Sequence, residues 1–281
     1  MNISFYASDK MREQELALAF LTGVEKHGDT GWVQPAGFVG IKPDLAVMVG
    51  VKSRYLHRSC QALGVHTIMI DKGYQRHRKP GGKGWEYWRC AIDAHHPTDM
   101  LMNIKRPSDR MAGVELARWH AKTRRGHIVI AGSSAKYHRF YDLPEPTQWT
   151  VDLVAEIRRH TDRPIVYRPK PSWHDAKPID GTRYSGPNEN IADVLRGAHA
   201  LVTHGSNACF EAVLAGVPCV ILGDGVAKPI SSTTIAEIES PLLASMQQRQ
   251  KWLAALSYCQ WTLEEFESGK AWAAIRPQIG A

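Results

Sequence analysis

The chain has 281 residues, 43% of them hydrophobic, with a formal net charge of +7 and a pI near 9.2. This length suits two domains of roughly 120 to 150 residues, each able to bury its own core. No apolar run approaches the roughly 20 residues of a membrane span, and MNISFYASDK at the N-terminus lacks the order of a secretion signal. We therefore expect a cytoplasmic protein without a membrane partner. Its five cysteines include no Cys-x-x-Cys pair, which indicates neither disulfides nor zinc.

The first half alternates short apolar runs with helical patterns. The predicted strands are residues 3–7, 45–51 and 66–71, and the predicted helices are residues 11–26, 53–64 and 114–119. Strands that are joined through helices run parallel, so this half predicts a parallel sheet wrapped by helices. A stretch rich in cations and aromatic rings, residues 72–89, interrupts the alternation.

The second half repeats this alternation. Its predicted strands are residues 127–132, 164–169, 200–203 and 219–222, and its predicted helices are residues 150–160, Ile191–Leu195 and a segment from Ala208 that stops at Gly216. The final residues, from Pro241, read as helical and polar enough to lie outside either sheet. We therefore predict an α/β protein with domains at residues 1–115 and 116–281, and with a cleft between facing carboxyl edges.

Polar turns follow four strands of the second half, at the edge where open α/β folds bind ligands. These turns hold Gly132, Ser133, Ser134, Arg168, Lys170, His204, Gly205, Ser206, Asn207 and Asp224. Small residues let backbone N–H groups approach an anion, and Arg168 can clamp two phosphate oxygens while Lys170 adds a point charge. Glu211, one turn into the following helix, and Asp224 suit sugar hydroxyls. An ordinary capped helix with a solvated Glu211 is the alternative.

The glycine pattern disfavours two other kinds of nucleotide site, a Rossmann nicotinamide site and a P-loop. No Gly-x-Gly-x-x-Gly opens the first predicted helix, and no Gly-x-x-x-x-Gly-Lys-Ser/Thr is present. The strand-end turns therefore favour a nucleotide-sugar as the ligand.

The segment ALVTHGSNACFEAVLAGVPCVIL resembles the donor-binding region of GT-B glycosyltransferases. In that family a polar turn and helix of the C-terminal domain hold the donor's diphosphate, and a helix glutamate holds its ribose. The resemblance implies a GT-B-like fold with two Rossmann-like domains, with Ser206 and Asn207 on the phosphates and Glu211 on the ribose. It also implies a UDP-sugar as donor substrate, with no prosthetic group. The stretches PEPTQWTVDLVAEIRRHTDRPIVYRPKP and WLAALSYCQWTLEEFESGKAW resemble phage-encoded glycosyltransferases of this fold, of the DNA-modification type.

Glycosyl transfer also needs a base that takes the proton of the acceptor hydroxyl. Asp71 directly follows a predicted strand of the first half, and IDKGYQR resembles an acidic motif of capsule-type sugar transferases, with Lys72 in the second acidic place. Asp9, after the first strand, is the rival base, and a cap or turn role is the alternative for both. His204 either binds the donor or makes a structural hydrogen bond. We expect no essential metal, because no Asp-x-Asp turn lies in a plausible donor site.

The stretch KGYQRHRKPGGKGWEYWR combines cations with aromatic rings, as a surface that meets phosphates and stacks on flat groups does. Its candidate acceptor-binding residues are Arg76, Arg78, Lys79, Trp85 and Trp88. With the phage-type resemblance, the stretch favours a hydroxymethylated pyrimidine in double-stranded phage DNA as the acceptor. A polysaccharide or capsule-type transferase, a nucleotide-sugar 2-epimerase and a non-catalytic DNA-binding protein remain alternatives. A solvated basic loop remains the simplest explanation of the stretch.

Overall fold

The structure is a computed structural model that describes residues 1–36, 42–75, 87–98, 101–102, 104–111, 113–120 and 125–280. The chain forms two compact units, the first made of Met1–Pro97 with Leu256–Ala281 and the second of Thr98–Ala255. The sequence predicted a boundary at residue 115 and assigned the closing helices to the second domain. These helices belong to the first unit instead, because Phe266 and Trp272 lie in its hydrophobic core.

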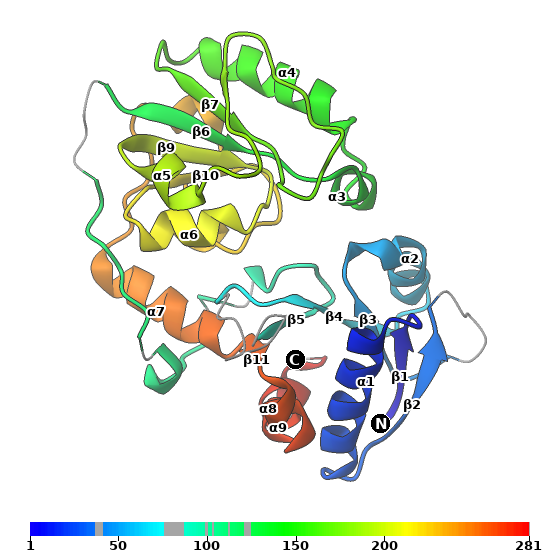
Figure 1. The fold of residues 1–281 in the computed structure, drawn as a ribbon. Helices are drawn as coiled ribbons and strands as arrows, with labels where there is room; N and C mark the ends of the chain where they lie inside the picture. Colours follow the sequence, from blue (N-terminus) through cyan, green and yellow to red (C-terminus); the bar gives the residue numbers. More distant parts are fainter. Residues whose placement is uncertain are drawn as a thin grey trace. The chain divides into compact units, whose positions relative to one another are not determined.

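The first unit contains one β-sheet, and helices connect or follow its strands (Figure 1). Its elements are β1 (Asn2–Ala7), α1 (Met11–Glu25), β2 (Thr30–Pro35), β3 (Leu45–Val49), η1 (Val51–Ser53), α2 (Arg54–Ala62), β4 (His66–Lys72), β5 (Trp88–Ile92), β11 (Gln260–Trp261), α8 (Leu263–Glu267), α9 (Lys270–Ile275) and η6 (Arg276–Gln278).

The strand order of the first sheet is β11-β5-β4-β3-β1-β2. Strands β2, β1, β3 and β4 are parallel, as the sequence predicted for β1, β3 and β4. Strand β5 runs antiparallel to β4 and sets Arg89 opposite Asp71, and β11 runs antiparallel to β5. The prediction that the C-terminal segment lies outside either sheet was therefore wrong, since β11 forms one edge of this sheet.

Aromatic side chains join α1 to the C-terminal helices of the first unit, where α8 and α9 lie beside α1 (Figure 1). The ring of Phe20 lies 5.6 Å from that of Phe5, 5.8 Å from that of Phe266 and 5.7 Å from that of Trp272, measured between centroids. At Gly23 the backbone of α1 comes so close to Phe266 that no Cβ would fit. The C-terminal segment is thus part of this core.

The second unit contains a fully parallel sheet with the order β10-β9-β6-β7-β8. Its elements are η3 (Asp109–Met111), β6 (His127–Ala131), α3 (Ala135–Phe140), α4 (Pro146–Arg158), β7 (Ile165–Arg168), β8 (Arg183–Tyr184), α5 (Ile191–Leu195), β9 (Ala198–Thr203), α6 (Ala208–Leu214), β10 (Cys219–Ile221), η4 (Lys228–Ile230) and η5 (Ile235–Glu237), and α7 (Met246–Ser257) leads back to the first unit. The four strands and three helices that the sequence predicted here are all present.

The predicted helix at residues 114–119 is not formed. Its backbone pairs with the end of α6 instead, because Ala117 N donates to Leu214 O (2.9 Å) and His120 N donates to Gly216 O (2.7 Å). Helical preference therefore yields to these tertiary hydrogen bonds. Over the residues described above, no helix has the length and apolar character that crossing a membrane requires.

Candidate functional site

The predicted donor residues gather at the carboxyl edge of the second sheet. Strands β10, β9, β6 and β7 lie side by side and parallel, so the turns after them share one edge. These turns carry Gly132, Ser133, Ser134, Arg168, Lys170, His204, Gly205, Ser206, Asn207 and Asp224. A further turn, after β8, joins the same edge through Ser185, whose N–H donates to Tyr167 O (2.8 Å). Sequence patterns missed this turn because β8 has only two residues.

Arg168 ends β7 and is held by the turn after β8. Its Nη1 donates to Ser185 Oγ (2.8 Å) and to Gly186 O (3.4 Å), and the residue is 9% exposed. Burial lowers the pKa of Arg168, while the carboxylates of Glu189 and Glu211 oppose that effect. The guanidinium therefore faces two carboxylates before any phosphate binds, whereas Lys170, two residues on, is exposed.

The turns after β6 and β9 are locked to their neighbours by backbone contacts. Gly132 N donates to Arg168 O (2.9 Å), and the hydroxyl of Thr203 donates to Ala131 O (2.8 Å). The same Thr203 hydroxyl accepts a hydrogen bond from Ser206 N (3.0 Å). These backbone groups hold the turns in place, so they are already engaged within the protein.

Helix α6 begins at Ala208 and has only seven residues. Asn207 makes no side-chain cap, and Ser206 Oγ accepts from Ala208 N at the long distance of 3.4 Å. Side-chain capping of this helix, which the alternative interpretation of the sequence invoked, is therefore weak. Among the turn residues of this edge, positive charge is carried by Arg168 and Lys170.

His204 lies among aromatic rings and directly against a glycine. Its Nδ1 is 3.0 Å from the Tyr137 hydroxyl, and its ring centroid is 5.7 Å from that of Tyr137 and 5.2 Å from that of Tyr141. A Cβ at Gly223 would lie closer than 3.0 Å to three atoms of the His204 ring. Burial, with the charge of His138, lowers the pKa of His204 to about 4, so the ring is neutral near pH 7.

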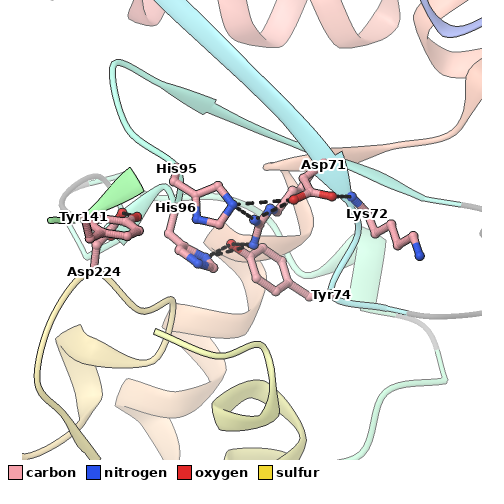
Figure 2. A network of polar contacts seen from close by, with 8 residues as sticks. Asp71, Lys72, Tyr74, His95, His96, Tyr141 and Asp224 are labelled. Atoms are coloured by element: carbon pink, nitrogen blue, oxygen red, sulfur yellow. Dashed lines mark hydrogen bonds and ion pairs between the residues drawn. The ribbon is translucent and has the colours of Figure 1, made fainter. Parts of the chain in front are cut away.

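Asp224 is engaged by hydroxyl groups of its own unit. Thr98 Oγ1 donates to Asp224 Oδ1 (2.6 Å), and the Tyr141 hydroxyl donates to Asp224 Oδ2 (2.7 Å). Figure 2 shows Tyr141 and Asp224 side by side. Each carboxylate oxygen thus already accepts one hydrogen bond. This geometry gives Asp224 a role in holding Tyr141, besides the sugar contact that the sequence suggested.

In the first unit, Asp71 lies at the carboxyl edge of β4 beside a buried polar cluster (Figure 2). Arg89 Nη2 donates to Asp71 Oδ2 (3.4 Å), and His95 Nε2 is 3.5 Å from the same oxygen. Asp71 Oδ1 accepts from the backbone N–H of Lys72 (2.7 Å). Burial raises the pKa of the Asp71 carboxyl, but the groups that contact it outweigh burial and hold that pKa well below its usual range. The Arg89 guanidinium is the permanent cation among these groups.

Sequence patterns missed Arg89 and the two histidines, because no motif links a strand arginine to a turn after that strand. The only local signal is the run Asp93-Ala94-His95-His96-Pro97. Asp93 has a φ of 54° and accepts from Thr67 N (2.6 Å), which fixes the turn that carries both histidines.

The rival base, Asp9, is an exposed residue that follows β1. Of the proposed acceptor-binding residues, Trp88 is 4% exposed and belongs to the core of the first unit, so its ring faces cannot receive a base. That prediction was wrong because Trp88 alternates inward in β5. Arg76, Arg78, Lys79 and Trp85 lie outside the described residues. Among the residues that are described, no group of three His, Cys, Asp or Glu side chains is placed to hold a metal.

No family model matches the chain, and no curated protein matches its sequence. Two solved structures of Thermosulfurimonas dismutans KpsC are similar to it. The KpsC beta Kdo 2,7 transferase has 14% identity and a TM-score of 0.55, over 96% of this chain and 99% of its own. The KpsC beta Kdo 2,4 transferase has 11% identity and a TM-score of 0.52, over 89% of each chain. Both are GT-B glycosyltransferases, and at this level of identity the similarity shows that the chain has the GT-B fold, with two Rossmann-like units.

Proposed function

We propose that the protein is a glycosyltransferase that moves a sugar from a nucleotide-sugar to an acceptor hydroxyl. The observation that carries the proposal is the row of turns at one edge of the second sheet, with Arg168 and Lys170 among small residues and Glu211 close to Arg168. The GT-B fold supports it, because open parallel sheets bind their ligands at this edge.

The donor half of the reaction requires stabilisation of a diphosphate that gains negative charge as it leaves. Arg168 and Lys170 supply positive charge there, in a region that is partly buried and therefore poorly screened. Glu211 accepts hydrogen bonds from the ribose, and its negative charge favours the charged form of Arg168. A UDP-sugar is the first donor to test.

The acceptor half of the reaction requires a base. Asp71 is our candidate, because its carboxylate is ionised and 36% exposed at the carboxyl edge of β4. Asp9, at the end of β1, is the second candidate.

As the acceptor we propose a hydroxymethylated pyrimidine in phage DNA. The basic residues Arg76, Arg78 and Lys79 lie between β4 and β5, and Gly73 N donates to Tyr87 O (2.8 Å) at the start of that connection. Cations of this kind contact a polyanion through its phosphates, and the net charge of +7 also favours such an acceptor. A saccharide chain is the second candidate, because IDKGYQR resembles the capsule-type motif and the protein shares the fold of KpsC.

The test is a product assay with a panel of nucleotide-sugars and three acceptor conditions: no acceptor, hydroxymethylated duplex DNA, and oligosaccharides. Mass spectrometry of the nucleosides or oligosaccharides should show the added mass of one sugar in one acceptor class. An isomerised donor formed without acceptor would establish a 2-epimerase instead. If no donor is consumed and no nucleotide-sugar raises the unfolding temperature, the proposed function is refuted.

The DNA proposal has a second test, the salt dependence of binding to duplex. Affinity should fall with salt by roughly one unit of log–log slope for each phosphate that is neutralised. Replacing Arg76, Arg78 and Lys79 together by glutamine should flatten this slope and leave nucleotide-sugar binding intact. An unchanged slope would remove these residues from the DNA surface, and a parent protein that binds no DNA at low salt would leave the saccharide candidate.

A further inference from the structure

A buried polar cluster of the first unit surrounds Arg89, whose guanidinium contacts Asp71. It consists of Tyr74, Arg89, His95 and His96, and we call it the Arg89 cluster. Each of the four residues is 6% exposed or less, whereas the Asp71 side chain is 36% exposed. Asp71 is therefore the solvent-facing end of a polar chain that continues into the core (Figure 2).

Arg89 makes the contacts that hold this chain together. Nη2 is 2.5 Å from His95 Nε2 and 3.4 Å from Asp71 Oδ2, and Nη1 is 2.9 Å from His96 Nδ1 and 3.3 Å from the Tyr74 hydroxyl. The Tyr74 hydroxyl is also 2.8 Å from His96 Nδ1. One guanidinium of β5 thus joins Asp71 of β4 and Tyr74 just after β4 to the two histidines that follow β5.

The chemistry of arginine fixes the direction of these hydrogen bonds. A guanidinium donates and never accepts, so His95 Nε2 and His96 Nδ1 are the nitrogens that accept, and each carries no proton of its own. His95 Nε2 and Asp71 Oδ2 are then two acceptors that share one donor group. The charge and the proton that face Asp71 inside the cluster both come from Arg89.

The groups around the carboxylate come from several elements. Arg89 faces it from β5 and His95 from the turn after β5, and the Lys72 backbone N–H lies beside it on β4. Directly after β3, Gly50 approaches with backbone only, since a Cβ there would lie 3.8 Å from Asp71 Oδ2. Within the part of the chain that the structure describes, Arg89 is thus the buried arginine that donates a hydrogen bond to Asp71.

We propose that Arg89 is the positioning residue of the acceptor-activating carboxylate: it holds Asp71 ionised and in one orientation, while His95 and His96 act as neutral acceptors that fix the guanidinium. This inference rests on the proposed function, in which Asp71 takes the acceptor's proton. It adds a role for residues that do not themselves touch the acceptor.

The test is the titration of the Asp71 carboxyl, followed by ¹³C NMR and assigned by the signal that Asp71→Asn removes. In the parent protein this carboxyl should stay ionised down to the acid limit of folding. In Arg89→Gln burial is no longer outweighed by the guanidinium, so the midpoint should rise to about 3.9 or above. Arg58→Gln, which removes an exposed arginine of the same unit, is the matched control and should leave the midpoint unchanged.

Because Arg89 is buried, Arg89→Gln could fail to fold, and a second pair of variants then decides. His95→Gln keeps an oxygen that accepts from Arg89 and should keep the Asp71 midpoint low. His95→Leu removes that acceptor and should raise the midpoint. Equal midpoints in these two variants, or a low midpoint in folded Arg89→Gln, would overturn the inference.

Activity assays separate this inference from the function on which it rests. If the protein transfers sugar, the acid limb of its pH–rate profile should move above about pH 4 in Arg89→Gln, a change that a merely structural role would not produce. A raised Asp71 midpoint in a protein that transfers no sugar would refute the function and keep the electrostatic role of Arg89. Transfer with an unmoved acid limb in Arg89→Gln would refute the role of Arg89 and keep the function.

Discussion

Replacing Gly223 by alanine tests how the donor edge holds His204. The added Cβ would lie closer than 3.0 Å to three atoms of the His204 ring, a distance that real Cβ atoms do not keep. Carbon atoms in contact lie about 3.5–4.0 Å apart. Because the added Cβ would lie well inside 3.0 Å of the ring, the ring must move by roughly 1–2 Å. The 3.0 Å contact between His204 Nδ1 and the Tyr137 hydroxyl cannot survive that movement.

Two magnitudes follow from this displacement. Overpacking of this kind costs about 1–3 kcal/mol of folding stability, which should lower the unfolding temperature by several degrees. A misplacement of about 1 Å at a reacting site costs on the order of a hundredfold in rate. Because the pKa of His204 is lowered to about 4, its ring is neutral in parent and variant near pH 7, and a change of protonation does not contribute.

The matched control is Gly186→Ala, in the turn after β8 at the same edge, where an added Cβ meets no atom within 4 Å. Thermal unfolding and steady-state transfer should be measured for both variants at pH 7. Gly223→Ala should lose stability and turnover, and Gly186→Ala should keep its stability. If Gly223→Ala unfolds at the parent temperature and turns over at the parent rate, the close contact of His204 with Gly223 is irrelevant to the site.

Three further predictions concern single residues. Arg168→Ala should lower the rate constant of transfer on the order of a hundredfold, because the positive charge of Arg168 matters most as the diphosphate leaves. If activity survives this change but is lost in Lys170→Ala, Lys170 is the residue that binds the phosphates. Glu211→Ala should weaken nucleotide-sugar binding by about 1–3 kcal/mol in calorimetry, because the ribose hydroxyls lose their acceptor. Unchanged affinity in the folded variant would exclude Glu211 from the donor site. Asp29 is buried, which raises the pKa of its carboxyl, but hydrogen bonds from Arg276 and Trp272 hold that pKa far below its usual range. The contribution of the ionised carboxylate to stability is therefore present above about pH 4 and is lost on acidification. Asp29→Asn should lower the unfolding temperature at pH 7, and this difference from the parent should shrink as the pH falls below about 4. An equal difference at all pH values would contradict this.

The donor edge could be predicted from sequence because each of its turns directly follows an apolar strand. Residues such as Arg168 and His204 are placed by the strand that precedes them, and parallel pairing then brings the turns together. Local patterns carry that information without any knowledge of tertiary contacts.

The Arg89 cluster could not be predicted, because its members meet only through tertiary structure. Arg89 is opposite Asp71 since β5 runs antiparallel to β4. The first two residues of β5 are the end of the stretch that the sequence predicted to be a basic surface. Similarly, Trp261 and Trp272 belong to the core of the first unit although they lie far along the chain from β1. Because their sequence neighbours are polar, the sequence predicted surface helices for these segments. Residues 114–119 do not form the predicted helix because of another tertiary contact: their backbone hydrogen bonds go to the end of α6.

The first unit is assembled from both ends of the chain, and this has a consequence for synthesis. Its edge strand β11 and helices α8 and α9 leave the ribosome only after the whole of Thr98–Ala255 has been made. At common translation rates that delay is on the order of ten to thirty seconds. During this time Phe20 on the nascent chain lacks Phe266 and Trp272, so the N-terminal unit should complete its folding last, as a client for chaperones that shield apolar surface.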